Sequence, residues 1–127
     1  MKILSVDDSA IIRKIVGSVC DMLGFELLEA EHGERALEIL QDHHQDISLI
    51  LLDWNMPVMD GHTALVKIKE HPVYSQIPVM MLTTEGSKSN IVDAIKAGAK
   101  QYLTKPFTPE DLSTKILQCV DNDLSLV

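Results

Sequence analysis

The sequence has little cysteine, a shortage of basic residues and no long apolar run. Its two cysteines, Cys20 and Cys119, lack CxxC spacing and each lies in a helix-like pattern. We therefore expect reduced, buried thiols and no disulfide. Eleven basic residues against nineteen acidic ones give a net charge of -8. Such a charge argues against nucleic acid or an anionic membrane surface as a direct partner.

No apolar stretch approaches the length of a membrane span. Asp7 and Asp8 interrupt the first apolar segment too early for a signal peptide, so we expect a cytoplasmic protein with no membrane partner. The 127 residues, 46% of them hydrophobic, are enough for one domain with a sizeable core. With no linker or internal repeat, residues 1–127 are expected to form a single domain.

Five apolar segments have the length and composition of β-strands. They lie at residues 2–6, 25–29, 47–52, 79–82 and 101–104, and a helix-like pattern of apolar residues follows each one. The second helix is expected to be short, and residues 85–90 are expected to form a polar loop before the fourth. Strands that alternate with helices predict a parallel sheet with right-handed crossovers and helices on both faces.

Capping residues mark the ends of several predicted helices. Ser9 is a good N-cap for the first helix, and Gly24 follows its last apolar residue. Gly98 is placed to end the fourth helix. Thr108 and Pro109 mark the start of the last helix as an N-cap and a first-turn proline.

Acidic, hydroxyl and basic side chains follow four of the predicted strands where each strand ends. These residues are Asp7 and Asp8, Asp53, Thr83, and Lys105. Because the carboxyl ends of parallel strands share one rim of the sheet, we expect these side chains to lie together there. A lone buried carboxylate at Asp53 would cost several kcal/mol, so a cation is expected beside it.

Three aspartates at one rim call for more positive charge than a single lysine supplies. At about 4 Å and an effective dielectric near 20, each pair of carboxylates repels by roughly 4 kcal/mol. An all-oxygen site suits Mg²⁺, with Mn²⁺ able to substitute. Lys105 and Thr83 offer a positive charge and a hydroxyl to phosphoryl oxygens. One carboxylate would then be the nucleophile that forms an aspartyl phosphate.

Each of these residues also has an ordinary structural interpretation. Asp8 or Asp60 could cap a helix, Thr83 could bond its own loop, and Lys105 could be a solvated surface charge. Five suitable groups at the same ends of four strands favour a functional site over five separate coincidences.

The residues at the predicted rim resemble the response-regulator receiver domains of two-component signalling, most closely the single-domain chemotaxis receivers. The likeness covers essentially the whole chain and rests on four segments: Asp7-Asp8, Asp53 with the loop DWNMPVMDG, Thr83, and Lys105-Pro106-Phe107. It implies a flavodoxin-like, doubly wound five-stranded parallel sheet in the order 2-1-3-4-5, with five helices on both faces. It also implies a cis peptide bond between Lys105 and Pro106.

The resemblance further implies a role for each site residue. Asp53 would accept a phosphoryl group from a phosphohistidine on a sensor histidine kinase or phosphotransfer protein. Asp8, Asp53 and the backbone carbonyl of Asn55 would hold Mg²⁺, with Asp7 acting through water. Thr83 would assist this chemistry together with Lys105. The protein would be a phosphoacceptor that assists its own phosphorylation and dephosphorylation, not an enzyme.

In the family, the phosphoryl group shifts the population between two states. Thr83 would move toward it and Tyr102 would turn inward, which reshapes the face made by helix four, strand five and helix five. Lys88, Tyr102 and Lys115 are the residues expected on this partner face, where a flagellar switch protein would bind. Thr84 is bulkier than the usual alanine, and only Lys88 stands where such receivers often carry two lysines.

The side chains of Asn55 and Glu85 match those of chemotaxis receivers at positions that set how fast water removes the phosphoryl group. Together with Trp54 they predict a short-lived phosphoryl state, and a phosphatase is a further candidate partner. Only residues 121–127 follow the last predicted helix, so we expect output through protein contacts.

Other functions share parts of this pattern. A phosphorelay shuttle or phosphate sink has the same chemistry without a flagellar target, and only the partner separates it from a chemotaxis receiver. An aspartate-nucleophile phosphatase would carry a DxD motif after the first strand, where Asp7 and Asp8 are adjacent instead. A flavin-binding module conflicts with these two acids, because they would repel a phosphate in the first loop.

Overall fold

Five parallel strands form one sheet in the order β2-β1-β3-β4-β5. The strands are β1 (Lys2–Val6), β2 (Glu26–Ala30), β3 (Ile47–Asp53), β4 (Val79–Thr84) and β5 (Gln101–Lys105). This computed structural model describes residues 1–56, 58–84 and 88–121, and it confirms the five predicted strands with small shifts at their ends. The strand order is the doubly wound, flavodoxin-like one that the sequence resemblance implied.

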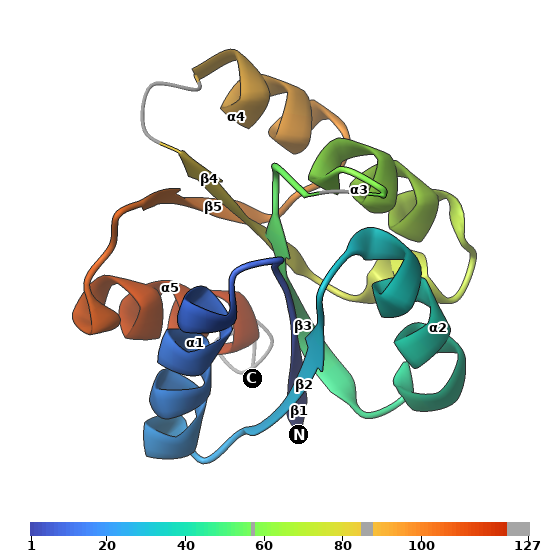
Figure 1. Ribbon diagram of the computed structural model, residues 1–127. Helices are drawn as coiled ribbons and strands as arrows, with labels where there is room; N and C mark the ends of the chain where they lie inside the picture. The colour runs from blue at the N-terminus through green and yellow to red at the C-terminus, as the bar shows by residue number, and fades with distance from the viewer. Residues whose placement is uncertain (57, 85–87, 122–127) are drawn as a thin grey trace.

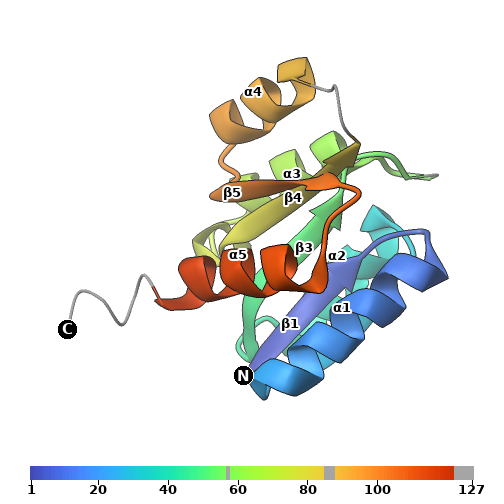
Figure 2. The same cartoon turned by 90° about the vertical axis from the view of Figure 1, so that its left-hand side faces the viewer.

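Helices cover both faces of the sheet (Figure 1). They are α1 (Ala10–Leu23), α2 (Gly33–His43), α3 (Gly61–Glu70), α4 (Lys88–Lys96) and α5 (Pro109–Asp121), with a short 3-10 helix, η1 (Tyr74–Gln76), before β4. Figure 2 shows α1 and α5 side by side on one face, with α2 and α3 on the other. The prediction missed η1 and began α4 too late, because residues 88–90 are already helical.

The predicted caps of α1 and α5 are confirmed. The Ser9 hydroxyl accepts a hydrogen bond from the Ile12 amide at 3.3 Å, and Gly24 ends α1 with φ +83°. At α5, the Thr108 hydroxyl accepts from the Asp111 amide at 3.0 Å, while the Asp111 carboxylate accepts from the Thr108 amide. These bonds satisfy backbone donors that the first turn of a helix leaves without partners.

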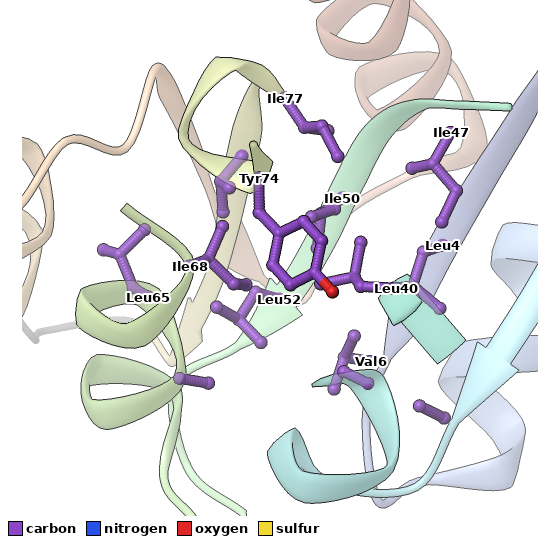
Figure 3. Packing of buried hydrophobic residues seen from close by; sticks show 14 of the residues in the cluster. Leu4, Val6, Leu40, Ile47, Ile50, Leu52, Leu65, Ile68, Tyr74 and Ile77 are labelled. Atoms are coloured by element: carbon purple, nitrogen blue, oxygen red, sulfur yellow. The ribbon is translucent and has the colours of Figure 1, made fainter. Parts of the chain in front are cut away.

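Two apolar layers hold the helices onto the sheet. One lies under α2, α3 and α4, where Figure 3 shows side chains from several elements meeting around the Tyr74 ring. The other lies under α1 and α5 and contains Cys20 and Cys119, which are buried free cysteines as predicted. Burial raises the pKa of the Cys20 thiol to about 11, which keeps it protonated at neutral pH.

The two layers explain why β1 and β3 are mostly apolar, since each strand is covered on its two faces. None of the helices in the described ranges combines the length and hydropathy that crossing a membrane requires. The two apolar layers give the sheet a buried centre, and polar side chains gather where its strands end.

Candidate functional site

The carboxyl ends of β1 and β3 bring three aspartates together. Val6 pairs with Leu52 in the parallel register of these strands, so Asp7 and Asp53, the next residues, lie at the same level. Asp8 follows Asp7 into the loop, and one carboxylate oxygen from each of the three lies within 4.8 Å of the others. Asp7 and Asp53 are buried, whereas Asp8 is exposed.

Lys105, at the end of β5, reaches across the rim to the two buried acids. Its ammonium nitrogen lies 3.0 Å from Asp7 Oδ2 and 3.1 Å from Asp53 Oδ1. The peptide bond that follows it, Lys105-Pro106, is cis. One half-buried lysine thus bridges two carboxylates that come from the ends of different strands, as the sequence pattern predicted.

The electrostatic balance at the rim favours a further cation. Burial, and then the charge of Asp7, raise the pKa of Asp53 to about 6, although Lys105 and a hydrogen bond from the Asn55 backbone pull it down. Burial also opposes the charge on Lys105, but its hydrogen bonds and attraction to Asp7 and Asp53 outweigh that effect and raise its pKa. Lys105 therefore stays charged without fully compensating Asp53.

Every polar atom of Asp7 has a partner. Its amide donates to Ala30 O at 3.0 Å, and its carboxylate accepts from the Ser9 amide at 2.8 Å as well as from Lys105. Its backbone carbonyl accepts from Arg13 Nη1. Arg13 was missed by the sequence analysis, because only its place in the first turns of the helix after the acids could have suggested it.

Thr83 and Asn55 flank Asp53 on the neighbouring segments. In the β3–β4 register Asp53 pairs with Leu82, so Thr83 stands one residue beyond it, and Thr83 is buried. Asn55 is exposed in the loop after β3, with its backbone close enough to hydrogen-bond Asp53. The Asn55 backbone therefore lies beside the Asp53 carboxylate, and Thr83 follows on β4 one residue beyond the partner of Asp53.

Gly61 is a second residue whose importance appears only in the structure. A Cβ atom at this position would lie 2.1 Å from the carbonyl oxygen of Asp53 and 2.7 Å from Cα of Trp54. The Gly61 amide donates to Trp54 O at 2.8 Å, so α3 begins directly against the backbone of Asp53. Asp60 caps α3 through the Thr63 amide at 2.8 Å, which confirms its structural interpretation.

Tyr102 and Lys115 lie apart from the acidic cluster, on β5 and α5. Tyr102 is 36% exposed, and the Lys115 ammonium lies 5.6 Å from the centre of its ring, within range of a cation–π contact. Lys88 is the first residue of α4. The predictions for Glu85 and for the side chains of Thr84 and Lys88 fall outside the described residues.

The donor set fits a hard divalent cation. The acidic cluster offers carboxylate oxygens, and neither sulfur nor imidazole belongs to it in the described part of the chain. Carboxylates with a backbone carbonyl and room for waters suit Mg²⁺ or Mn²⁺ better than Zn²⁺. A cation here would offset the repulsion that raises the pKa of Asp53.

Comparisons with known proteins agree with this geometry. The family model for the response regulator receiver domain matches residues 3–117. Chemotaxis protein CheY1 of Helicobacter pylori is 44% identical over 91% of this chain and 94% of that protein. The CheY homolog of Campylobacter jejuni is 41% identical over 91% of this chain and 89% of that protein.

The solved structure of Vibrio cholerae chemotaxis protein CheY4 superposes with a TM-score of 0.83 at 38% identity, covering 94% of this chain and 97% of that one. The fold, the rim of acids with its lysine, and the sequence comparisons lead to one assignment. This chain belongs to the response-regulator receiver family, whose members are signalling proteins.

Proposed function

We propose that this receiver takes a phosphoryl group onto Asp53 from a phosphohistidine of a sensor histidine kinase or phosphotransfer protein. A carboxylate oxygen of Asp53 attacks phosphorus, the phosphorus–nitrogen bond breaks, and its electron pair leaves with the imidazole, which takes up a proton. The observation that carries the proposal is Lys105, held 3.1 Å from Asp53 and 3.0 Å from Asp7. Its ammonium is positioned to bind an oxygen of the transferred group.

The same rim supplies the remaining groups. Asp8, Asp53 and the backbone carbonyl of Asn55 would hold Mg²⁺ or Mn²⁺, with Asp7 acting through water. When bound, the cation neutralises charge on the phosphoryl oxygens during transfer. Thr83 is buried beside the end of β3, where its hydroxyl can donate to a phosphoryl oxygen. Removal of the phosphoryl group by water would be tuned by exposed Asn55 and by Glu85.

Output would pass through the α4, β5 and α5 surface. Half-exposed Tyr102 lies on β5, and Lys115 of α5 contacts its ring. Movement of Thr83 toward the phosphoryl group would allow Tyr102 to turn inward and change this surface, a shift between two populated states. The named relatives are chemotaxis proteins, so a flagellar switch protein is the proposed target and a phosphatase the proposed antagonist.

Transfer from a radiolabelled phosphotransfer domain tests the chemistry. We expect label to move to the wild type in Mg²⁺, and not to Asp53→Asn or to the wild type in a chelator. Lys105→Met, which keeps an unbranched side chain without the charge, should take up label much more slowly. Equal labelling of Asp53→Asn and wild type would contradict the proposal.

Binding to a switch-protein peptide then separates a chemotaxis receiver from a relay shuttle or phosphate sink. We expect tighter peptide binding after phosphorylation, and weaker binding by Tyr102→Ala, Lys88→Ala and Lys115→Ala. A phosphorylated protein that transfers its group onward to a second histidine domain and ignores the peptide would instead establish the relay or sink.

A further inference from the structure

Arg13 reaches from α1 to the backbone between the two acids of the β1 loop. Its Nη1 donates to the carbonyl oxygen of Asp7, and its Nε donates to Glu29 Oε1 at 3.1 Å on β2. The Arg13 side chain is only 17% exposed. One guanidinium therefore ties the first turns of α1 to the ends of β1 and β2.

The carbonyl of Asp7 belongs to the peptide plane that leads into Asp8. Holding this oxygen restrains the plane, which contains the backbone nitrogen and Cα of Asp8, and so restrains the point from which the Asp8 side chain leaves the backbone. Asp8 is exposed, and within residues 1–56, 58–84 and 88–121 no side chain or amide bonds its carboxylate. The orientation of Asp8 thus depends on the backbone before it, which Arg13 holds.

We infer that Arg13 is a positioning residue for the proposed cation site, acting through the Asp7–Asp8 peptide; this inference rests on the proposed function. Glu29 orients the guanidinium through its Nε, so that the planar fork of Arg13 serves both partners at once. A lysine at this position has a single ammonium on a flexible stem and cannot reproduce that geometry. Residues that orient metal ligands typically contribute 10- to 100-fold to metal affinity.

A positioning role and a purely electrostatic role of Arg13 predict opposite changes in Mg²⁺ affinity when Arg13 is replaced. A cation near the acidic cluster repels Mg²⁺, so removing only its charge would tighten Mg²⁺ binding. Loss of positioning would weaken Mg²⁺ binding instead. Lys14 is adjacent to Arg13 on α1 but exposed, so Lys14→Gln provides the matched change of charge.

The test combines Mg²⁺ titration, followed by Trp54 fluorescence, with amide hydrogen exchange in metal-free protein. We expect Arg13→Gln to weaken Mg²⁺ binding by about tenfold or more, Arg13→Lys to fall between it and wild type, and Lys14→Gln to match wild type. The Ser9 amide, which donates to Asp7, should exchange fastest in Arg13→Gln, at an intermediate rate in Arg13→Lys, and as in wild type in Lys14→Gln. Denaturant midpoints confirm that each variant is folded under the titration conditions.

Unchanged or tighter Mg²⁺ binding by Arg13→Gln would overturn the inference. If the wild type itself gave no Mg²⁺ response, the result would contradict the proposed function, because the proposed cation site would be absent. Exchange of the Ser9 amide distinguishes failure of the proposed function from failure of the inference on Arg13. Faster exchange in Arg13→Gln would support the role of Arg13 in positioning the loop after β1, and unchanged exchange would overturn that role.

Discussion

Replacing Asp53 by asparagine should make the metal-free protein more stable while removing its proposed phosphoacceptor. The side chain is nearly isosteric and only 5% exposed, so the core beneath it need not repack. What changes is the buried charge beside Asp7. Lys105 retains its bond to Asp7 at 3.0 Å, so the variant does not leave the ammonium without an anion.

The magnitude follows from the pKa of Asp53. Burial and the charge of Asp7 raise it from its ordinary value of 3.8 to about 6. A shift of this size corresponds to about 3 kcal/mol of unfavourable ionisation at neutral pH. This pKa already includes the attraction to Lys105, and asparagine cannot ionise, so the expected gain in the free energy of unfolding at neutral pH is up to about 3 kcal/mol.

The direction of the Asp53 pKa shift determines how the free energy of unfolding depends on pH. Because the folded-state pKa lies above the ordinary value, ionised Asp53 destabilises the fold at pH 7. This cost shrinks as the pH falls through about 6 and disappears below about 4, where both states are protonated. The difference in stability between variant and wild type should therefore be largest at pH 7 and should disappear as the pH falls from about 6 to about 4. Mg²⁺ affinity of the wild type should fall over the same range.

Urea unfolding in a chelator, and again in Mg²⁺, provides the assay. Asp42→Asn, on the exposed surface of α2, controls for the change of net charge. Mg²⁺ should stabilise wild type and the control far more than Asp53→Asn. A midpoint of Asp53→Asn equal to or below wild type in the chelator, with no dependence on pH, would refute the electrostatic reasoning.

Three further changes test other parts of the site. Gly61→Ala should lower the free energy of unfolding by more than about 2 kcal/mol, because a Cβ would lie 2.1 Å from the Asp53 carbonyl oxygen; a wild-type urea midpoint would contradict this. Val58 has φ +67° and is 73% exposed, so Val58→Asn should stabilise the protein by about 1 kcal/mol, and a lower midpoint would show that the strain is absent. Asn55→Lys should slow loss of a radiolabelled phosphoryl group, because an exposed ammonium there can pair with its oxygens and hinder water. An unchanged decay rate would remove Asn55 from the tuning role.

The strands and the rim could be predicted because their signals are local. A strand buried on both faces is mostly apolar, and the apolar run of β3 ends on Asp53. Parallel pairing then forces Asp7 and Asp53 to one level. Lys105 could be expected beside them, since the acids required a cation.

The missed features depend on atoms that meet only after folding. Arg13 bonds a backbone carbonyl six residues away, and no spacing rule marks that contact. The need for glycine at position 61 comes from the approach of α3 to the backbone of β3. Val58 has a left-handed backbone conformation, which β-branched residues rarely adopt. The conformational preference of valine therefore did not predict the observed turn.

Intact-mass measurement after incubation with Mg²⁺ and a small phosphodonor tests the central claim most directly, because it needs no partner protein. The wild type should gain the mass of one phosphoryl group, while Asp53→Asn and wild type in a chelator should gain nothing. A wild type that gains no mass, or a variant that gains as much, would contradict the account.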